Sequence, residues 1–135
     1  NILRLGRMTG NLDLEKIAEQ IIKTFGETIN QHPSGYTQFM CALDFALGPT
    51  REIVIAGKPD QKDTKQILQE IGKRFLPRKV LLLHPSKDRS IEKIAQFIKE
   101  QLSIEGKATA YICENYACNA PTNDINKIIQ LLEGQ

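Results

Sequence analysis

Four residues whose side chains can do chemistry stand at the ends of predicted strands: Asp60, His84, Cys113 and Cys118. Each follows a short apolar run of the length and composition that are typical of a buried strand. In an open parallel sheet, ligands bind beyond the carboxyl ends of the strands. We therefore expect these four residues to lie along one candidate functional edge, where redox, metal or histidine chemistry could take place.

The two cysteines of this edge allow three interpretations. Four residues separate Cys113 from Cys118, whereas a thioredoxin-type redox pair has two residues between its cysteines. The favoured interpretation is a pair of structural or free thiols. The alternatives are a reversible disulfide, or two thiolates that join His84 as zinc ligands and leave the fourth ligand unassigned. His84 itself precedes Pro85, a position where a histidine usually caps or packs instead of catalysing.

Gly57 and Lys58 follow the first predicted strand and invite comparison with a phosphate-binding loop. That motif needs two glycines framing four residues, followed by Lys-Ser or Lys-Thr, and neither it nor GxGxxG occurs in the sequence. No serine lies in a nucleophile-elbow motif. The sequence therefore indicates no cofactor and establishes no reaction, so whether the protein is an enzyme stays open.

Asp44 is the one charged residue in an otherwise apolar predicted helix at residues 36–47. A buried carboxylate must be either paired or neutral. The favoured interpretation is an ion pair with an arginine such as Arg4 or Arg51. The alternative is a candidate cleft carboxylate, which would face a cavity formed together with helices that lie outside this sequence.

The elements that carry these residues fall into two parts, of which the first is a helical pair at residues 1–48. Apolar residues recur at three- and four-residue steps across residues 14–29, which predicts a helix capped by Asn11 or Asp13. The second helix, at residues 36–47, is apolar nearly all round and needs burial on most of its sides. Because a chain of 135 residues cannot easily hide so much apolar surface, we expect this pair to pack against a missing neighbour.

The second part, residues 49–135, is predicted to be a small α/β domain. Three apolar runs predict strands, at residues 52–56, 79–83 and 107–112. Apolar stripes predict three helices, at residues 63–75, 90–102 and 122–132. Because each connection between strands exceeds twenty residues and carries a helix, we predict a three-stranded parallel sheet with right-handed crossover helices, preceded by the helical pair.

Composition and charge narrow the functional classes. The net charge is only +2 and the cations are spread among acids, which argues against a nucleic-acid-binding surface. No apolar run approaches the roughly 20 residues of a membrane span, and the sequence starts without a signal-peptide pattern or an initiator Met, which suggests a fragment of a larger chain. Three cysteines cannot all pair within one chain, which favours a reducing, cytoplasmic location.

Two stretches of the sequence resemble a known family. The first is ALDFALGP at residues 42–49 running into REIVIAG at residues 51–57, and the second is TAYIC at residues 109–113 with Asn115, Cys118, Pro121 and Thr122. Both are similar to the C-terminal end of the thioredoxin-domain-containing, spermatogenesis-associated (YyaL-like) proteins. The resemblance implies an upstream thioredoxin-like domain and an (α/α)6 toroid similar to sugar epimerases and six-hairpin glycosidases, followed by a small α/β tail.

The resemblance also implies that residues 1–48 are the last helices of that toroid, and that the redox motif of the parent lies outside this sequence. It carries no defined catalytic residue onto this chain, although Cys113 and Cys118 match the tail pattern. We predict a non-catalytic structural or interaction domain that packs on other domains of its own chain or self-associates, without nucleic-acid or membrane partners. The alternatives are a redox or metal site at Cys113 and Cys118, and a contribution of Asp44 to a carbohydrate-binding cleft.

Overall fold

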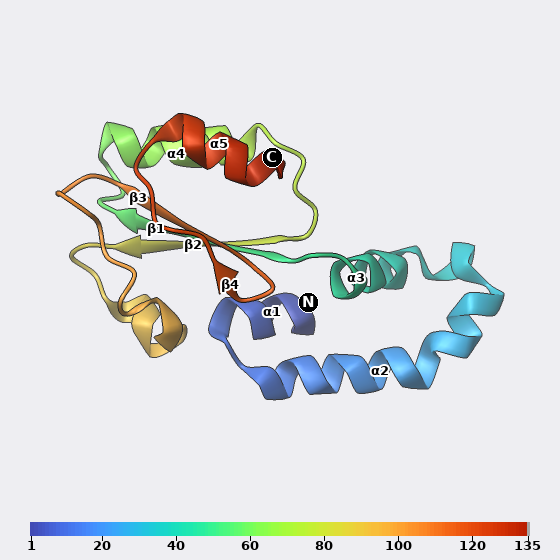
Figure 1. The fold of residues 1–135 in the computed structure, drawn as a ribbon. Helices are drawn as coiled ribbons and strands as arrows, with labels where there is room; N and C mark the ends of the chain where they lie inside the picture. The colour runs from blue at the N-terminus through green and yellow to red at the C-terminus, as the bar shows by residue number, and fades with distance from the viewer. Residues whose placement is uncertain (135) are drawn as a thin grey trace.

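The computed structural model describes residues 1–134, which form five α-helices, four β-strands and three short 3₁₀ turns. In chain order these are α1 (Ile2–Thr9), α2 (Leu12–Gln31), η1 (Pro33–Tyr36), α3 (Thr37–Leu47), β1 (Arg51–Gly57), α4 (Lys62–Gly72), β2 (Lys79–Pro85), η2 (Ser90–Lys93), η3 (Gln96–Ile98), β3 (Thr109–Glu114), β4 (Ala117–Cys118) and α5 (Ile125–Glu133). Helices α4 and α5 cover one face of the sheet, while α2 and α3 reach out to one side (Figure 1).

The first two helices meet at a tight corner. Gly10 closes α1 with a φ of 70°, the left-handed conformation common after a helix. Asn11 then caps α2 as predicted, because its Oδ1 accepts from the backbone N–H groups of Asp13 and Leu14. At Gly6 an added Cβ would lie 2.9 Å from the Cγ of Glu15, so glycine there lets the two helices approach closely. Helix α1 was not predicted, whereas α2 and α3 form where the apolar patterns place them.

The sheet is mixed, with the strand order β2-β1-β3-β4, so the prediction of a three-stranded parallel sheet is wrong. The α/β class is confirmed, and β1 and β2 are parallel, with α4 in the connection between them. β3 runs antiparallel to β1, and β4, which was not predicted, folds back antiparallel onto β3. The turn between β3 and β4 has positive φ at both Asn115 (49°) and Tyr116 (67°), as a tight two-residue hairpin requires.

The direction of β3 follows from the connection before it. The apolar stripe at residues 90–102 predicted a helix, but the structure forms only the turns η2 and η3 there, so that prediction is wrong. The segment stays beside the end of β2, where His84 contacts both Glu92 and the backbone oxygen of Gln101. β3 therefore starts opposite Ala56, at the end of β1, and has to run back along it.

The core is divided between the two faces of the sheet by the alternation of side chains along β1. Ile53 and Ile55 face α4 and α5, where they pack with Ile71 and Ile128. Val54 faces the opposite side. The cluster there comprises Val54, Leu82, Ala95 and Ile98, with Met8, Ile91 and Tyr111 packed against it. Both faces of β1 are thus covered, which is why the strand is buried along nearly its whole length.

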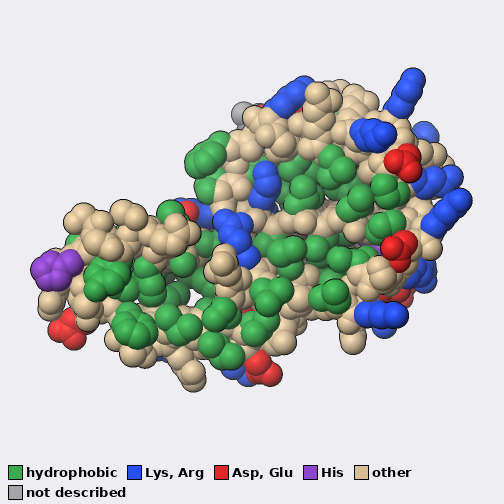
Figure 2. Space-filling view, turned by 180° about the vertical axis from the view of Figure 1, so that it is seen from behind, with side chains coloured by type: hydrophobic (Ala, Val, Ile, Leu, Met, Phe, Trp, Pro, Cys, Tyr) green, Lys and Arg blue, Asp and Glu red, His purple; other side chains and the backbone are tan. Residues whose placement is uncertain are grey.

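Helices α2 and α3, here called the helical arm (residues 12–47), have far less core. Within residues 1–47 the buried positions of the α-helices are Gly6, Ala18, Ile29 and Phe45. Figure 2 shows hydrophobic side chains gathered along the arm on the surface of the molecule. Polar contacts join α1, which precedes the arm, to the start of β2: Arg4 donates to the carbonyl oxygens of Lys79 (2.7 Å) and Pro77 (2.6 Å).

Candidate functional site

The structure divides the predicted functional edge between the two ends of the sheet. His84 lies opposite Ala56 at the carboxyl end of β1, and Asp60 is exposed in the loop that follows that end. Cys113 instead lies opposite Glu52, near the beginning of β1. The two positions lie four residue steps apart along β1, which is roughly 13 Å at about 3.3 Å per step. The four residues were placed together by assuming a parallel β3, and its reversal separates them.

His84 is buried and both of its ring nitrogens are engaged. Nδ1 lies 2.8 Å from the backbone oxygen of Gln101, and Nε2 lies 2.9 Å from Oε1 of Glu92. Glu92 is itself nearly buried and also receives Nε of Arg89 at 3.2 Å. The imidazole therefore links β2 to the segment that carries η2 and η3. This arrangement is the one expected of the packing role that the sequence favoured for His84, because both ring nitrogens contact groups of the protein itself.

Cys113 and Cys118 form a disulfide across the β3–β4 hairpin. The two residues are directly paired in the antiparallel register, next to the hydrogen bond from the Asn119 N–H to the Ile112 carbonyl. Cys113 is buried and Cys118 is exposed. The structure thus shows the two cysteines joined, whereas the reversibility of the bond, which was one of the sequence alternatives, stays a prediction.

The tip of this hairpin carries a polar cluster that the sequence did not predict. We call Arg7, Glu15, Glu52 and Tyr116 the hairpin cluster. The Tyr116 N–H donates to Oε2 of Glu52 at 3.0 Å, and its hydroxyl donates to Glu15. Arg7 bonds Oε1 of Glu52 at 3.1 Å, approaches Glu15 at 3.4 Å, and lies over the Tyr116 ring, 4.3 Å from its centroid. Residues from α1, α2, β1 and the hairpin therefore meet at one point.

Burial sets the protonation behaviour of the hairpin cluster. Desolvation raises the pKa of Glu52, against the opposing effects of the Tyr116 N–H and of Arg7. Desolvation and the hydrogen bond to Glu15 together raise the pKa of Tyr116 to about 12. The tyrosine therefore stays a neutral donor at physiological pH. The only signal in the sequence was an acidic residue, Glu52, at the start of an otherwise apolar strand.

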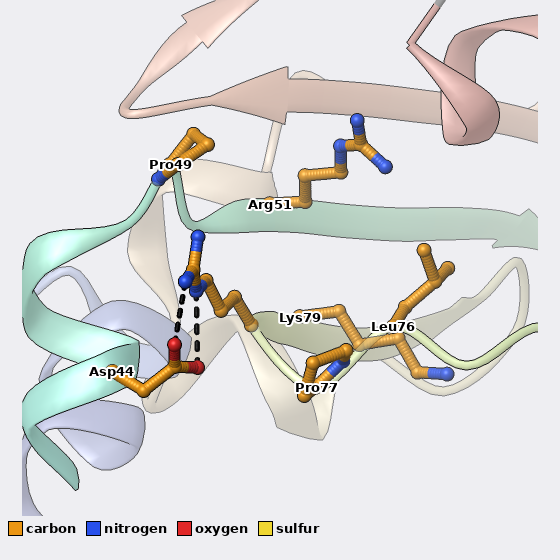
Figure 3. A pocket seen from close by; sticks show the side chains of 7 residues that line it. Asp44, Pro49, Arg51, Leu76, Pro77 and Lys79 are labelled. Atoms are coloured by element: carbon orange, nitrogen blue, oxygen red, sulfur yellow. Dashed lines mark hydrogen bonds and ion pairs between the residues drawn. The ribbon is translucent and has the colours of Figure 1, made fainter. Parts of the chain in front are cut away.

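Asp44 is paired with an arginine, but with Arg78 and not with Arg4 or Arg51. Nε of Arg78 lies 3.0 Å from Oδ2 of Asp44, and a second contact joins Nη2 to Oδ1. The hydrogen bond from Arg78 lowers the pKa of Asp44. Both side chains are partly exposed, at 46% for Asp44 and 38% for Arg78. They line a shallow cavity of about 250 Å³ together with Pro49 and Arg51 (Figure 3).

An extended apolar feature of the surface lies on the helical arm. Ile17, Ile21 and Phe25 follow one another at four-residue steps along α2 and are 44%, 36% and 52% exposed. Beside them, α2 and α3 enclose an open groove of about 440 Å³. Its apolar lining comprises Ile22, Ile29, Phe39, Met40 and Leu43. We call the exposed stripe of α2 together with this groove the arm face.

Two further features bear on the functional class. Among residues 1–134, no three His, Cys, Asp or Glu side chains gather closely enough to hold a metal ion. None of the helices formed by those residues combines the length and the hydropathy that crossing a membrane requires.

Comparison with known proteins relates nearly the whole chain to one kind of protein. The chain is 32% identical over 133 residues to spermatogenesis-associated protein 20 of Rattus norvegicus, Homo sapiens and Mus musculus, and the match covers 98% of this chain. It spans only 17% of the length of these relatives. No family model matches the chain, and no solved structure gives a significant match. The resemblance found in the sequence is confirmed, and the chain is homologous to one part of a larger protein similar to spermatogenesis-associated protein 20.

Proposed function

We propose that this chain is a non-catalytic, C-terminal interaction domain of a larger protein, and that it docks on the rest of that protein through the arm face. Two facts support the proposal. The relatives that match nearly the whole chain are several times longer than the chain itself and the arm exposes apolar side chains at helical spacing. The α/β part, by contrast, buries its core on both faces of the sheet.

The exposed stripe of α2 is the single observation that carries this proposal. Ile17, Ile21 and Phe25 lie on one side of a 20-residue helix, as core-facing residues do. Each is already about half covered, so completing its burial contributes on the order of 1 kcal/mol. Contiguous apolar patches of this kind mark interaction sites on soluble proteins. A docked partner would cover the groove beside the stripe in the same step.

The proposed occupant is an apolar helical surface of the same polypeptide. The stripe and the groove lining contain no charged side chain apart from Glu27 at the rim, which suits an apolar partner and not a phosphate backbone. A second copy of the chain is the competing occupant, and it would appear as self-association. We also propose a reducing, cytoplasmic location, which the exposed free thiol of Cys41 supports.

The proposal is tested by comparing two double variants of α2 with matched chemistry. Ile21→Gln with Phe25→Gln removes apolar surface from the arm face. Glu19→Gln with Lys23→Gln makes the same number of changes among exposed polar residues of α2 and leaves the net charge unaltered. We expect binding of a hydrophobic dye to fall about twofold or more in the first variant only.

An unaltered chain that binds no hydrophobic dye would contradict the proposal. Equal behaviour of the two double variants would do so as well. Self-association that the first variant abolishes, without any docking to the rest of the larger protein, would assign the arm face to a second copy instead.

A further inference from the structure

The hairpin cluster holds the α/β part and the helices together, and its tyrosine sits in an unfavourable backbone conformation. Tyr116 has a φ of 67°, a region that large L-residues rarely adopt. Its N–H, hydroxyl and ring are each engaged, by Glu52, Glu15 and Arg7. Residues held in this way persist only where their surroundings over-determine them, and they gather at switches. The conformation of Tyr116 thus depends on whatever keeps the hairpin closed.

The disulfide is the strongest constraint on that closure. β4 contains only two residues and both are exposed. Beyond it, Asn119 donates to the Ile112 carbonyl from both its backbone N–H and its side-chain amide, and Thr122 pairs with Ala110 farther along β3. The Cys113–Cys118 bond joins the two strands two residues from Tyr116. Without this bond, the turn would be held only by hydrogen bonds: the short exposed ladder of β4, the bonds between Asn115 and Thr50, and the contacts of Tyr116 itself.

The accessibility of the disulfide makes it exchangeable. Cys118 is an exposed residue, which makes its side of the disulfide the one open to an external thiolate, whereas Cys113 is buried. Exposed disulfides are the labile and regulatory ones, and disulfides in reducing compartments are usually transient. We propose that Cys113–Cys118 is a thiol–disulfide switch. A dithiol reductant opens the disulfide, and opening it releases Tyr116 from Glu52, Glu15 and Arg7. This inference is independent of the docking partner proposed for the arm face.

The exchange balances as a two-electron transfer. A thiolate of the dithiol attacks Sγ of Cys118, the Cys113–Cys118 bond breaks, and the electron pair leaves on Cys113, which takes up a proton. The second thiol of the reductant then attacks the mixed disulfide and releases Cys118 as a second thiol. The dithiol is oxidised to a disulfide, and two electrons and two protons pass to the cysteines. Reoxidation by a disulfide reverses each step.

The test uses the Cys41→Ser variant, in which every reactive thiol belongs to the pair. Without reductant we expect no titratable thiol in the folded protein. After treatment with dithiothreitol we expect two titratable thiols. Hydrogen exchange followed by mass spectrometry should show the Tyr116 amide, which donates to Glu52, exchanging about tenfold or more faster in the reduced protein. Exchange in the α4 and α5 helices serves as the internal control and should not change.

Three results would overturn the switch. Two free thiols in the protein purified without reductant would show that the disulfide does not form. Resistance of the folded protein to dithiothreitol would show that the disulfide cannot be exchanged. If reduction left the exchange of the Tyr116 amide unchanged, the disulfide would not be coupled to the hairpin cluster. A Cys113→Ser, Cys118→Ser variant, where it folds, should exchange rapidly with or without reductant. Dye binding at the arm face is a separate readout, so failure of either proposal is recognised on its own.

Discussion

At the scale of single residues, Asp63 shows how one carboxylate fixes two elements. Its Oδ1 accepts from the backbone N–H of Thr64 in the first turn of α4 at 2.8 Å, and its Oδ2 accepts from the N–H of Ala108 just before β3 at 2.7 Å. The bond from Ala108 is the main reason why the pKa of Asp63 lies below its ordinary value of 3.8. The sequence placed Asp63 at the start of a helix, but it could not reveal a partner 45 residues away.

The lowered pKa predicts how Asp63 affects stability as the pH changes. A carboxyl group whose pKa is lower in the folded state stabilises fully above its unfolded pKa, near 3.9, and that contribution is lost as the pH falls through the folded value. We expect Asp63→Asn to lower the free energy of unfolding at pH 7 by about 1–2 kcal/mol and to flatten its decline below about pH 4.

Urea unfolding at a series of pH values checks this prediction. Asp60→Asn is the matched control, since Asp60 is an exposed aspartate in the preceding loop and should leave the profile unchanged. An Asp63→Asn profile parallel to that of the unaltered protein down to pH 2.5, with no loss of stability at pH 7, would show that the carboxylate contributes nothing.

At the scale of elements, residues 90–102 show that an apolar pattern can predict which side chains face the core but not which kind of helix forms. Ile91, Ala95 and Ile98 do face the core, as the apolar stripe predicted, but Ile94 is 64% exposed. Steps of three and four residues suit successive 3₁₀ turns as well as an α-helix. His84 contacts Glu92 near the start of this segment and the Gln101 carbonyl near its end, and so holds both ends against β2. These long-range contacts decide the outcome and do not appear in local periodicity.

We expect His84→Ala to loosen this segment selectively. Removing a buried imidazole with two polar partners should cost about 2–4 kcal/mol of unfolding free energy, because Glu92 and the Gln101 carbonyl lose their bonds. Hydrogen exchange should rise across residues 90–101 more than in α4. His32→Ala is the control, since His32 is exposed at the end of α2. Comparable stability of the two variants would contradict the linking role of His84.

The same reasoning explains which strands were predicted correctly from the sequence and which were not. The β-branched run of β1 identified a buried strand correctly, and the α4 crossover gave the parallel partner β2. The direction of β3 depended on the missing helix, and so did the position of Cys113 relative to His84. β4 is too short, at two residues, for any periodicity to register. Its presence follows from the turn at Asn115 and Tyr116, which the sequence did not disclose.

At the scale of the whole molecule, the most informative property of the sequence was that its helices carry more apolar surface than the chain can bury. The helix at residues 36–47 was expected to need more cover than the chain provides, and in the structure only Phe45 of α3 is buried. The α/β part closes its own core on both faces of the sheet, while the arm extends beyond it (Figure 1). The hairpin cluster and the Arg4 contacts attach the helices by polar bonds, which leaves the arm face open to a partner.

The most direct test of docking is the reactivity of the arm face in two settings. Phe25→Cys, in a Cys41→Ser background, is labelled with a maleimide in this chain alone and in the larger polypeptide proposed to contain it. Lys23→Cys, on the polar side of α2, is the control and should react equally in both. We expect Phe25→Cys to react about tenfold or more slowly in the larger polypeptide, because docking covers it. Equal labelling of Phe25→Cys in the two settings would contradict docking through the arm face.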